Sequence, residues 1–318
     1  MHFLSKNIKI MKNYISCKSV FLMIVLLFCS NIVLKAQPPP IFASTELNYV
    51  LYNPAYSGIN SNKIEFGTHY QNYLLFFYDN EYVGITPNSY SFSFKLPLKN
   101  KILTGGGINF LSEESGFYKK THFDIPLSVR KHFKFGTLFF GINPGVLSEQ
   151  IIITNMWPNP EPLDTAFKLL LKFGSGLYFT NYKNFYMGFS SQQLFTRILY
   201  DGWENIQLSY HTFHLLSAGY NFKFNPGSLF SFQPNFIYCF DYAKKNFYLG
   251  LNTIYKDKYS LKLVFDLNFP HATAIGFDIP VGKNFVVSGY YNDFFNSLFA
   301  YSFGRFEIGL KYKIALDK

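Results

Sequence analysis

Apolar and aromatic side chains in this chain recur at every second position instead of gathering in long runs. Tyr259 and Leu261 share one face of their segment, for example, while Ser260 and Lys262 lie on the other. This period of two predicts β-strands. After residue 36 the longest apolar run has six residues, from 73 to 78, whereas a membrane-spanning helix needs about 20. The pattern therefore favours a sheet protein without membrane helices.

Residues 1–36 have the composition of a secretory signal peptide. The segment begins with lysines and no acidic residue, continues with an unbroken apolar run at 20–29, and ends on the small residue Ala36. An anchoring helix is the alternative, but ten apolar residues are too few to cross a bilayer core, which takes about 20. We therefore expect export of the chain and removal of this segment.

Composition limits the classes of protein that the exported chain can form. Without residues 1–36, which hold five lysines and no acidic residue, the formal charge falls from +10 to +5. We expect no nucleic-acid partner, because the protein is exported and has no basic cluster. Cys239 is the one cysteine beyond the leader, which leaves no internal disulfide.

The aromatic content indicates a membrane barrel. The chain has 39 Phe and 25 Tyr, and a barrel in a bacterial outer membrane turns alternate side chains to lipid and carries aromatic girdles at both interfaces. A soluble β-sandwich is the alternative, but it would not need so many aromatic side chains on its outer faces. The fold class that we predict is all-β, a transmembrane antiparallel β-barrel.

Strands and connections can be placed along the chain from alternation and turn chemistry. Short polar turns, such as 256–258 and 282–284, alternate with longer connections at 73–87, 148–170, 194–208 and 296–303, the pattern of outer-membrane barrels. We predict about fourteen strands, an even number as antiparallel closure requires, at 63–71, 88–97, 101–111, 120–133, 135–147, 171–180, 184–192, 209–224, 229–240, 246–256, 258–268, 272–280, 283–294 and 304–314.

Three segments follow from these observations: the leader at 1–36, an N-terminal segment at 37–62, and the barrel at 63–318. Pro38, Pro39 and Pro40 cannot donate to a strand ladder, because proline lacks the N–H group. We expect the segment to lie in the lumen or at the periplasmic mouth.

The hexapeptide Asn53-Pro54-Ala55-Tyr56-Ser57-Gly58 resembles the Asn-Pro-Ala-Tyr-Ala-Gly signature of the PorP/SprF family. Leu163–Phe167, with Asp164 and Phe167, is similar to a family loop. Tyr210–Tyr220, with His211, His214, Gly219 and Tyr220, is similar to a His-rich family strand. Further stretches agree in order from about Gln37 to Ile314. Departures include Tyr70–Tyr73, where the family often has Arg-x-Gln-Trp, and Thr165, where it has proline.

The resemblance implies a role in the type IX secretion system and its gliding machinery. Family members look like 14-stranded barrels, integral to the bacterial outer membrane, that support secretion or surface attachment of cargo. The partners implied are outer-membrane lipid, type IX cargo such as an adhesin, and periplasmic secretion-system proteins. A passive pore or small-molecule transporter of the outer membrane is the alternative function, because it would share the fold.

No constellation of residues indicates catalysis, a cofactor or a metal. His211 and His214 are three residues apart, so on a strand they would point to opposite faces and could not bind one ion. No serine lies in a nucleophile-elbow motif. An enzyme acting on lipids is a third hypothesis, and we expect no enzymatic activity, no cofactor and no metal site.

Exposed aromatic and apolar residues in the long connections are our candidates for contact with partner proteins. Exposed patches of this kind mark protein or membrane contacts, and aromatic residues dominate interface energetics. Residues 73–78 could instead form part of a strand or the barrel mouth. The candidates are Leu74, Leu75, Phe76, Phe77, Trp157 and Trp203.

Overall fold

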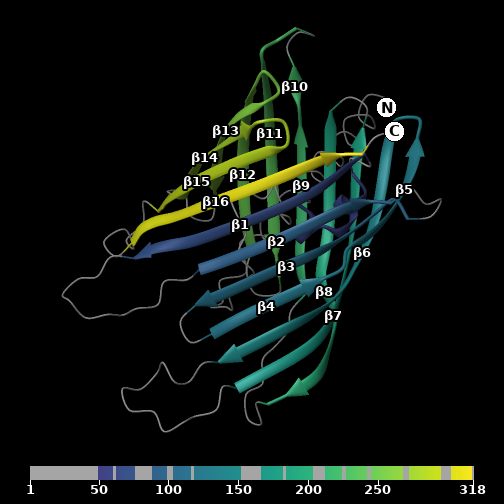
Figure 1. Ribbon diagram of the computed structural model, residues 1–318, viewed down its shortest axis with the longest axis vertical. Helices are drawn as coiled ribbons and strands as arrows, with labels where there is room; N and C mark the ends of the chain where they lie inside the picture. The colour runs from purple at the N-terminus through teal and green to yellow at the C-terminus, as the bar shows by residue number, and fades with distance from the viewer. Residues whose placement is uncertain are drawn as a thin grey trace, which may run out of the picture. The chain divides into compact units, whose positions relative to one another are not determined.

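The computed structural model is an antiparallel β-barrel (Figure 1). It describes residues 49–59, 62–75, 88–98, 103–115, 118–151, 166–181, 184–202, 212–223, 227–241, 245–267, 272–294 and 302–316. Its strands are β1 (Lys63–Leu75), β2 (Asn88–Pro97), β3 (Gly105–Ser115), β4 (Tyr118–Asp124), β5 (Leu127–Phe133), β6 (Gly136–Ile151), β7 (Ala166–Asn181), β8 (Phe185–Asp201), β9 (Phe213–Tyr220), β10 (Phe222–Lys223), β11 (Phe230–Phe240), β12 (Lys245–Tyr255), β13 (Tyr259–Asp266), β14 (Ala272–Val281), β15 (Phe285–Phe294) and β16 (Ser302–Ala315).

The barrel is closed, and its strands occupy fourteen positions around the wall. Of the sixteen strands in the described part of the chain, β4 and β5 share the position between β3 and β6, and β9 and β10 share the position beside β11. β1 pairs with β16 and β9 pairs with β11, so the ladder has no open ends. Every pairing between neighbours is antiparallel. The prediction of a 14-stranded transmembrane barrel is confirmed.

Several strand ends differ from the prediction. The segment predicted as one strand at 120–133 is interrupted at Ile125 and Pro126, because proline cannot donate to the ladder. β1 continues to Leu75, β6 to Ile151 and β8 to Asp201, where long connections were predicted. The ends of β1 and β8 were missed because alternation lapses there: residues 73–78 and 198–200 are consecutive apolar side chains.

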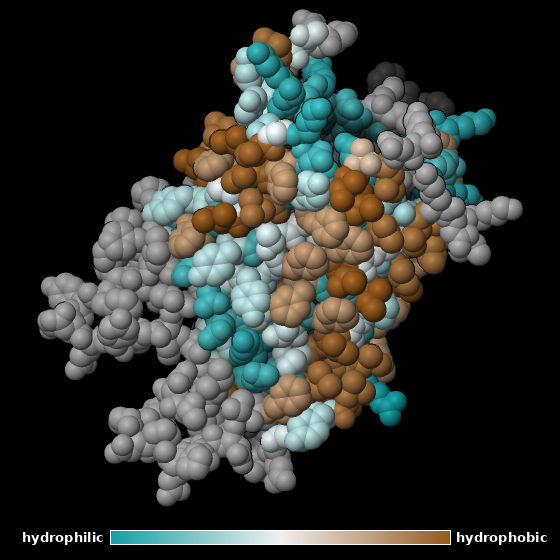
Figure 2. All heavy atoms as spheres, in the orientation of Figure 1, coloured by the Kyte–Doolittle hydropathy of each residue, from teal (hydrophilic) through white to brown (hydrophobic). Residues whose placement is uncertain are grey.

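The outer face of the wall is apolar. In β14, Ile275, Phe277 and Ile279 are exposed, although a soluble protein would bury such side chains. Figure 2 shows apolar residues gathered over the strands of the visible face. Among the described residues, no helix is long and apolar enough to cross a membrane. An apolar exterior on a closed sheet is the surface that lipid requires, because closure leaves no unpaired backbone edge.

The inner face is polar and charged. In β2, Ser89, Ser91, Ser93 and Lys95 are buried, while Tyr90 and Phe92 between them are exposed. Buried cations are paired with carboxylates: Lys95 Nζ lies 3.2 Å from Glu65 Oε2, Lys172 Nζ 2.9 Å from Asp124 Oδ2, and Lys262 Nζ 2.9 Å from Asp278 Oδ2. Such pairing is what allows charges to lie away from water.

A candidate functional site in the barrel lumen

Residues 49–59, which we call the lumenal segment, lie against the inner face of the wall. They form the single-turn helix α2 (Tyr49–Tyr52) and the 3-10 helix η2 (Pro54–Gly58). Residues 49–58 are buried except for Tyr56, which is half-buried. Asn53 caps η2 in an extended conformation, and Pro54 follows at the first helical position, where its fixed φ and missing N–H cost nothing. The sequence Asn-Pro thus begins this turn.

Asn53 joins the lumenal segment to two strands. Its Oδ1 accepts a hydrogen bond from the Ala55 amide at 3.0 Å, which holds the turn. Its Nδ2 donates to the carbonyl of Leu177 in β7 at 2.9 Å and to that of Phe189 in β8 at 3.4 Å. One side chain that is 1% exposed therefore shapes the turn and fastens it to the wall.

Glycines in the wall leave room for residues 53–58, which we call the signature turn. A Cβ atom at Gly141 in β6 would overlap the backbone of Pro54 and Ala55, and one at Gly176 in β7 would overlap the Asn53 side chain. Gly141 and Gly176 face each other in the β6–β7 register, so they form one recess. These glycines allow the close approach of a second backbone segment.

The second half of the turn contacts the wall through Tyr56 and Ser57. The Tyr56 ring packs edge-on against Tyr178, with centroids 5.5 Å apart, and Lys95 Nζ lies 5.2 Å from the Tyr56 centroid. Ser57 Oγ donates to Ser128 Oγ at 2.9 Å. The turn is thereby held on β2, β5 and β7 as well as by Asn53.

α2 is held by hydrogen bonds to its carbonyl groups. The Val50 carbonyl accepts from Asn109 Nδ2 at 2.8 Å, and the Tyr52 carbonyl accepts from Ser190 Oγ at 2.6 Å and Gln192 Nε2 at 2.8 Å. These donors stand on β3 and β8 and satisfy carbonyls that such a short helix leaves unpaired.

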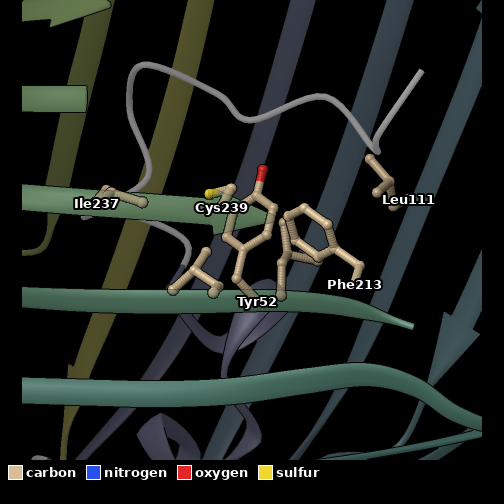
Figure 3. Packing of buried hydrophobic residues seen from close by; sticks show 7 residues of the cluster. Tyr52, Leu111, Phe213, Ile237 and Cys239 are labelled. Atoms are coloured by element: carbon tan, nitrogen blue, oxygen red, sulfur yellow. The ribbon is translucent and has the colours of Figure 1, made fainter. Parts of the chain in front are cut away.

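Apolar side chains complete the contact of α2 with the wall. Tyr52 lies among side chains from β9 and β11 (Figure 3), and the buried cluster comprises Leu51, Tyr52, Leu111, Phe213, Leu215, Ile237 and Cys239. Cys239 is a free cysteine. The lumenal segment is therefore held by polar and apolar contacts at both ends, because Ala55 of η2 packs in a second buried cluster with Phe139, Tyr178 and Tyr186.

The structure separates the signature residues into two groups. Asn53, Pro54, Ala55, Tyr56 and Gly58 meet in the lumen. Gly219 of β9 leaves room for the Tyr186 ring, which a Cβ atom at this position would overlap, and Tyr186 packs in one buried cluster with Ala55 and Tyr56.

The remaining signature residues that are described belong to the wall. His214 lies between Phe189 and Phe240, with centroids at 6.1 and 4.8 Å, and its Nδ1 is 2.8 Å from Ser191 Oγ. Phe167 packs on Tyr200 and Tyr220 on Phe222. Asp164 and His211 lie outside the described residues.

The candidates for partner contact were predicted to lie in connections. Leu74 and Leu75 belong instead to β1, where they pair with β16, so that placement was wrong. Phe76, Phe77, Trp157 and Trp203 lie outside the described residues. The sequence analysis also missed the wall residues that contact the lumenal segment, notably Gly141, Gly176, Asn109, Ser190 and Gln192. The sequence gives one sign of this contact, which is a glycine at an inward-facing position of a strand.

The closed wall, apolar exterior and polar lumen define an integral outer-membrane β-barrel. Among solved structures, the chain is similar to a monoaromatic hydrocarbon channel, the TodX deltaS2S3 mutant, with 11% identity and a TM-score of 0.52 over 85% of this chain and 94% of that one. It is also similar to the CymD monoaromatic hydrocarbon channel, with 10% identity and a TM-score of 0.51 over 87% and 94%. At such identities the likeness is one of fold alone.

The family is established by sequence. A family model described as "Type IX secretion system membrane protein PorP/SprF" matches residues 34–312. The chain belongs to the PorP/SprF family, which confirms the resemblance to that family. A comparison with curated proteins gives no match.

Proposed function

We propose that this protein assists type IX secretion, or the surface anchoring of adhesin- or gliding-type cargo, through protein–protein contacts. Its partners would be cargo and periplasmic proteins of the secretion system. The observation that carries the proposal is that a family-signature segment occupies the lumen of a family-type barrel. The role requires no catalytic chemistry.

The lumenal contacts favour an assembly component over an open channel. Hydrogen bonds join the lumenal segment to β3, β5, β7 and β8, and α2 packs on β9 and β11. A segment held from so many sides would obstruct a water-filled path along the barrel axis.

A passive pore or small-molecule transporter is the alternative function. The charged inner wall, with Lys172–Asp124 and Lys262–Asp278, is the observation in its favour, because polar linings are found in water-filled porins. The two functions differ in conductance. Steady conductance by the purified protein in a planar bilayer would support the pore.

The experiment that tests the proposal is deletion of the gene followed by surface proteomics. We expect at least one protein that carries a type IX C-terminal signal to be lost from the surface, while other envelope proteins remain. Re-expression of the natural chain should restore display, and re-expression of Asn53→Ala at equal barrel abundance should restore it less well. Normal display of every such substrate in the deletion strain would refute the proposed function.

A further inference from the structure

Among the described residues, the exposed charge at the short-turn end of the barrel is predominantly positive, whereas cations and carboxylates are mixed at the other end. At the end with short turns, the exposed cationic residues in the described part of the chain are Lys63, Arg130, Lys131, Lys134, Lys223, Lys256, Lys258 and Lys283, and the exposed acidic residue there is Asp257. At the other end, described lysines such as Lys119 and Lys245 are mixed with carboxylates such as Glu114 and Asp201. One rim is therefore strongly positive.

The hairpin between β5 and β6 has the densest group of these cations. Among residues 130–135, which are all described, Arg130, Lys131 and Lys134 are exposed and there is no acidic residue. At the β12–β13 turn, by contrast, Asp257 is bound by Lys223 Nζ at 2.8 Å. The positive charge of the β5–β6 hairpin is thus not balanced within the hairpin.

Aromatic side chains lie directly beside these cations on the outer face. The rings of Phe133 and Phe135 stack at 5.5 Å with 18° between their planes, and Phe135 lies 5.7 Å from Phe179 of β7. Lys131 Nζ is 5.6 Å from the Phe133 centroid. Phe135 is 67% exposed, the highest value among the large apolar residues that the structure describes.

The aromatic cluster of Phe133, Phe135 and Phe179 lies at the edge of the apolar band on the outer face of the wall. Phe140 and Leu177 are exposed on the same face of β6 and β7, deeper along the strands, where lipid chains would contact them. In bacterial barrels the short turns face the periplasm, and aromatic girdles lie at the level of the lipid headgroups. Lysines at that level extend toward the headgroups along their alkyl chains.

We propose that the β5–β6 hairpin binds the phosphate groups of anionic phospholipids in the inner leaflet of the outer membrane. Lys131 and Lys134 contact the phosphate, and the stack of Phe133, Phe135 and Phe179 holds the upper acyl chain. Each cation near an anionic surface is worth about fivefold in affinity, the equivalent of ~1 kcal/mol.

The same combination recurs around the rim, which favours lipid over a single protein partner. Lys256 Nζ lies 5.1 Å from the Tyr255 ring, itself 4.9 Å from Phe230. Lys283 precedes Phe285, whose ring is 4.4 Å from Tyr312. A lipid annulus contacts the whole circumference, whereas a docked protein would need cations on one side.

The test is native mass spectrometry of the purified full barrel in zwitterionic detergent, titrated with phosphatidylglycerol or with phosphatidylcholine of identical acyl chains. The natural protein should bind phosphatidylglycerol about 25-fold more tightly than phosphatidylcholine. Lys131→Gln/Lys134→Gln should lose about 25-fold for phosphatidylglycerol, about fivefold for each cation, with little change for phosphatidylcholine. The control, Lys119→Gln/Lys245→Gln at the opposite end, should stay within about twofold of the natural protein.

Two measurements keep the result interpretable. Heat-modifiable migration on gels reports whether each variant is folded, and Lys131→Arg/Lys134→Arg should retain binding because it keeps both charges. On the natural protein, the preference for phosphatidylglycerol should fall as salt is raised. Equal binding of the two lipids, a salt-independent preference, or an unchanged Lys131→Gln/Lys134→Gln variant would overturn the proposal. So would a photo-crosslinker at position 135 that labels a protein in cells and no lipid.

Discussion

Replacing Asn53 by alanine should release the lumenal segment while leaving the barrel wall intact. The change removes the acceptor of the Ala55 amide and the donor to the carbonyls of Leu177 and Phe189. The carbonyls of Leu177 and Phe189 belong to strands of the wall, so the loss of the hydrogen bonds to them destabilises the docked segment less than the loss of the bond to the Ala55 amide. The Ala55 amide is buried and would lose its partner, which costs about 1–3 kcal/mol.

The magnitude follows from these contacts. Adding about 1 kcal/mol for the bond to Leu177, we expect the docked state to be destabilised by about 2–4 kcal/mol. Since each 1.4 kcal/mol is about a factor of ten, the undocked population should rise roughly 30- to 700-fold. The global stability of the barrel should change far less, because its ladder does not involve the Asn53 side chain.

Hydrogen exchange of the barrel in nanodiscs measures this population. Peptides that cover 49–59 should exchange faster in Asn53→Ala by about that factor, whereas peptides from β12 and β13 should be unchanged. The matched control is Asn252→Ala, since Asn252 is also a buried asparagine of the wall, on β12, and its side chain donates to Gln233 of β11. Equal protection of 49–59 in the natural protein and in Asn53→Ala would refute the account of how the segment is held.

Two further substitutions test the recess and the lipid face. Gly141→Val fills the space of Pro54 and Ala55, so 49–59 should lose protection from exchange, whereas Gly227→Val, where nothing lies within 4 Å, should not affect it. Ile275→Arg and Val281→Arg alter outward side chains that are 55% and 52% exposed but differ in depth along β14. In unfolding from a bilayer, the first should cost about 2–4 kcal/mol and the second about 0–1; equal costs would contradict the assigned membrane band.

The barrel could be predicted from sequence because each strand and each turn is determined by residues that are close together in the chain. An alternating strand such as 259–267 and a turn such as 256–258 each identify themselves within about ten residues. Closure then requires an even strand number. The ends of β1 and β8 were missed because consecutive apolar residues there hide the period of two.

The lumenal site could not be predicted in the same way, because its contacts join distant parts of the chain. Asn53 meets Leu177 across 124 residues, and Tyr52 meets Ser190 across 138. The signature hexapeptide indicated that the turn mattered, and its Asn-Pro start is readable as a helix cap. Which wall residues receive it depends on register, and only inward-facing glycines such as Gly141 gave a sign of close approach.

A disulfide between the lumenal segment and the wall tests the central claim most directly. Ser57 Oγ and Ser128 Oγ are 2.9 Å apart, so cysteines at these positions are close enough to be bridged in a chain whose Cys239 is replaced by alanine. Ser57→Cys/Ser128→Cys should form the bridge nearly completely in outer membranes, as peptide mass spectrometry would show, while Ser57→Cys/Ser231→Cys, which places the second cysteine on β11, should not. Absence of a bridge in the folded Ser57→Cys/Ser128→Cys barrel would contradict a lumen occupied by the signature turn.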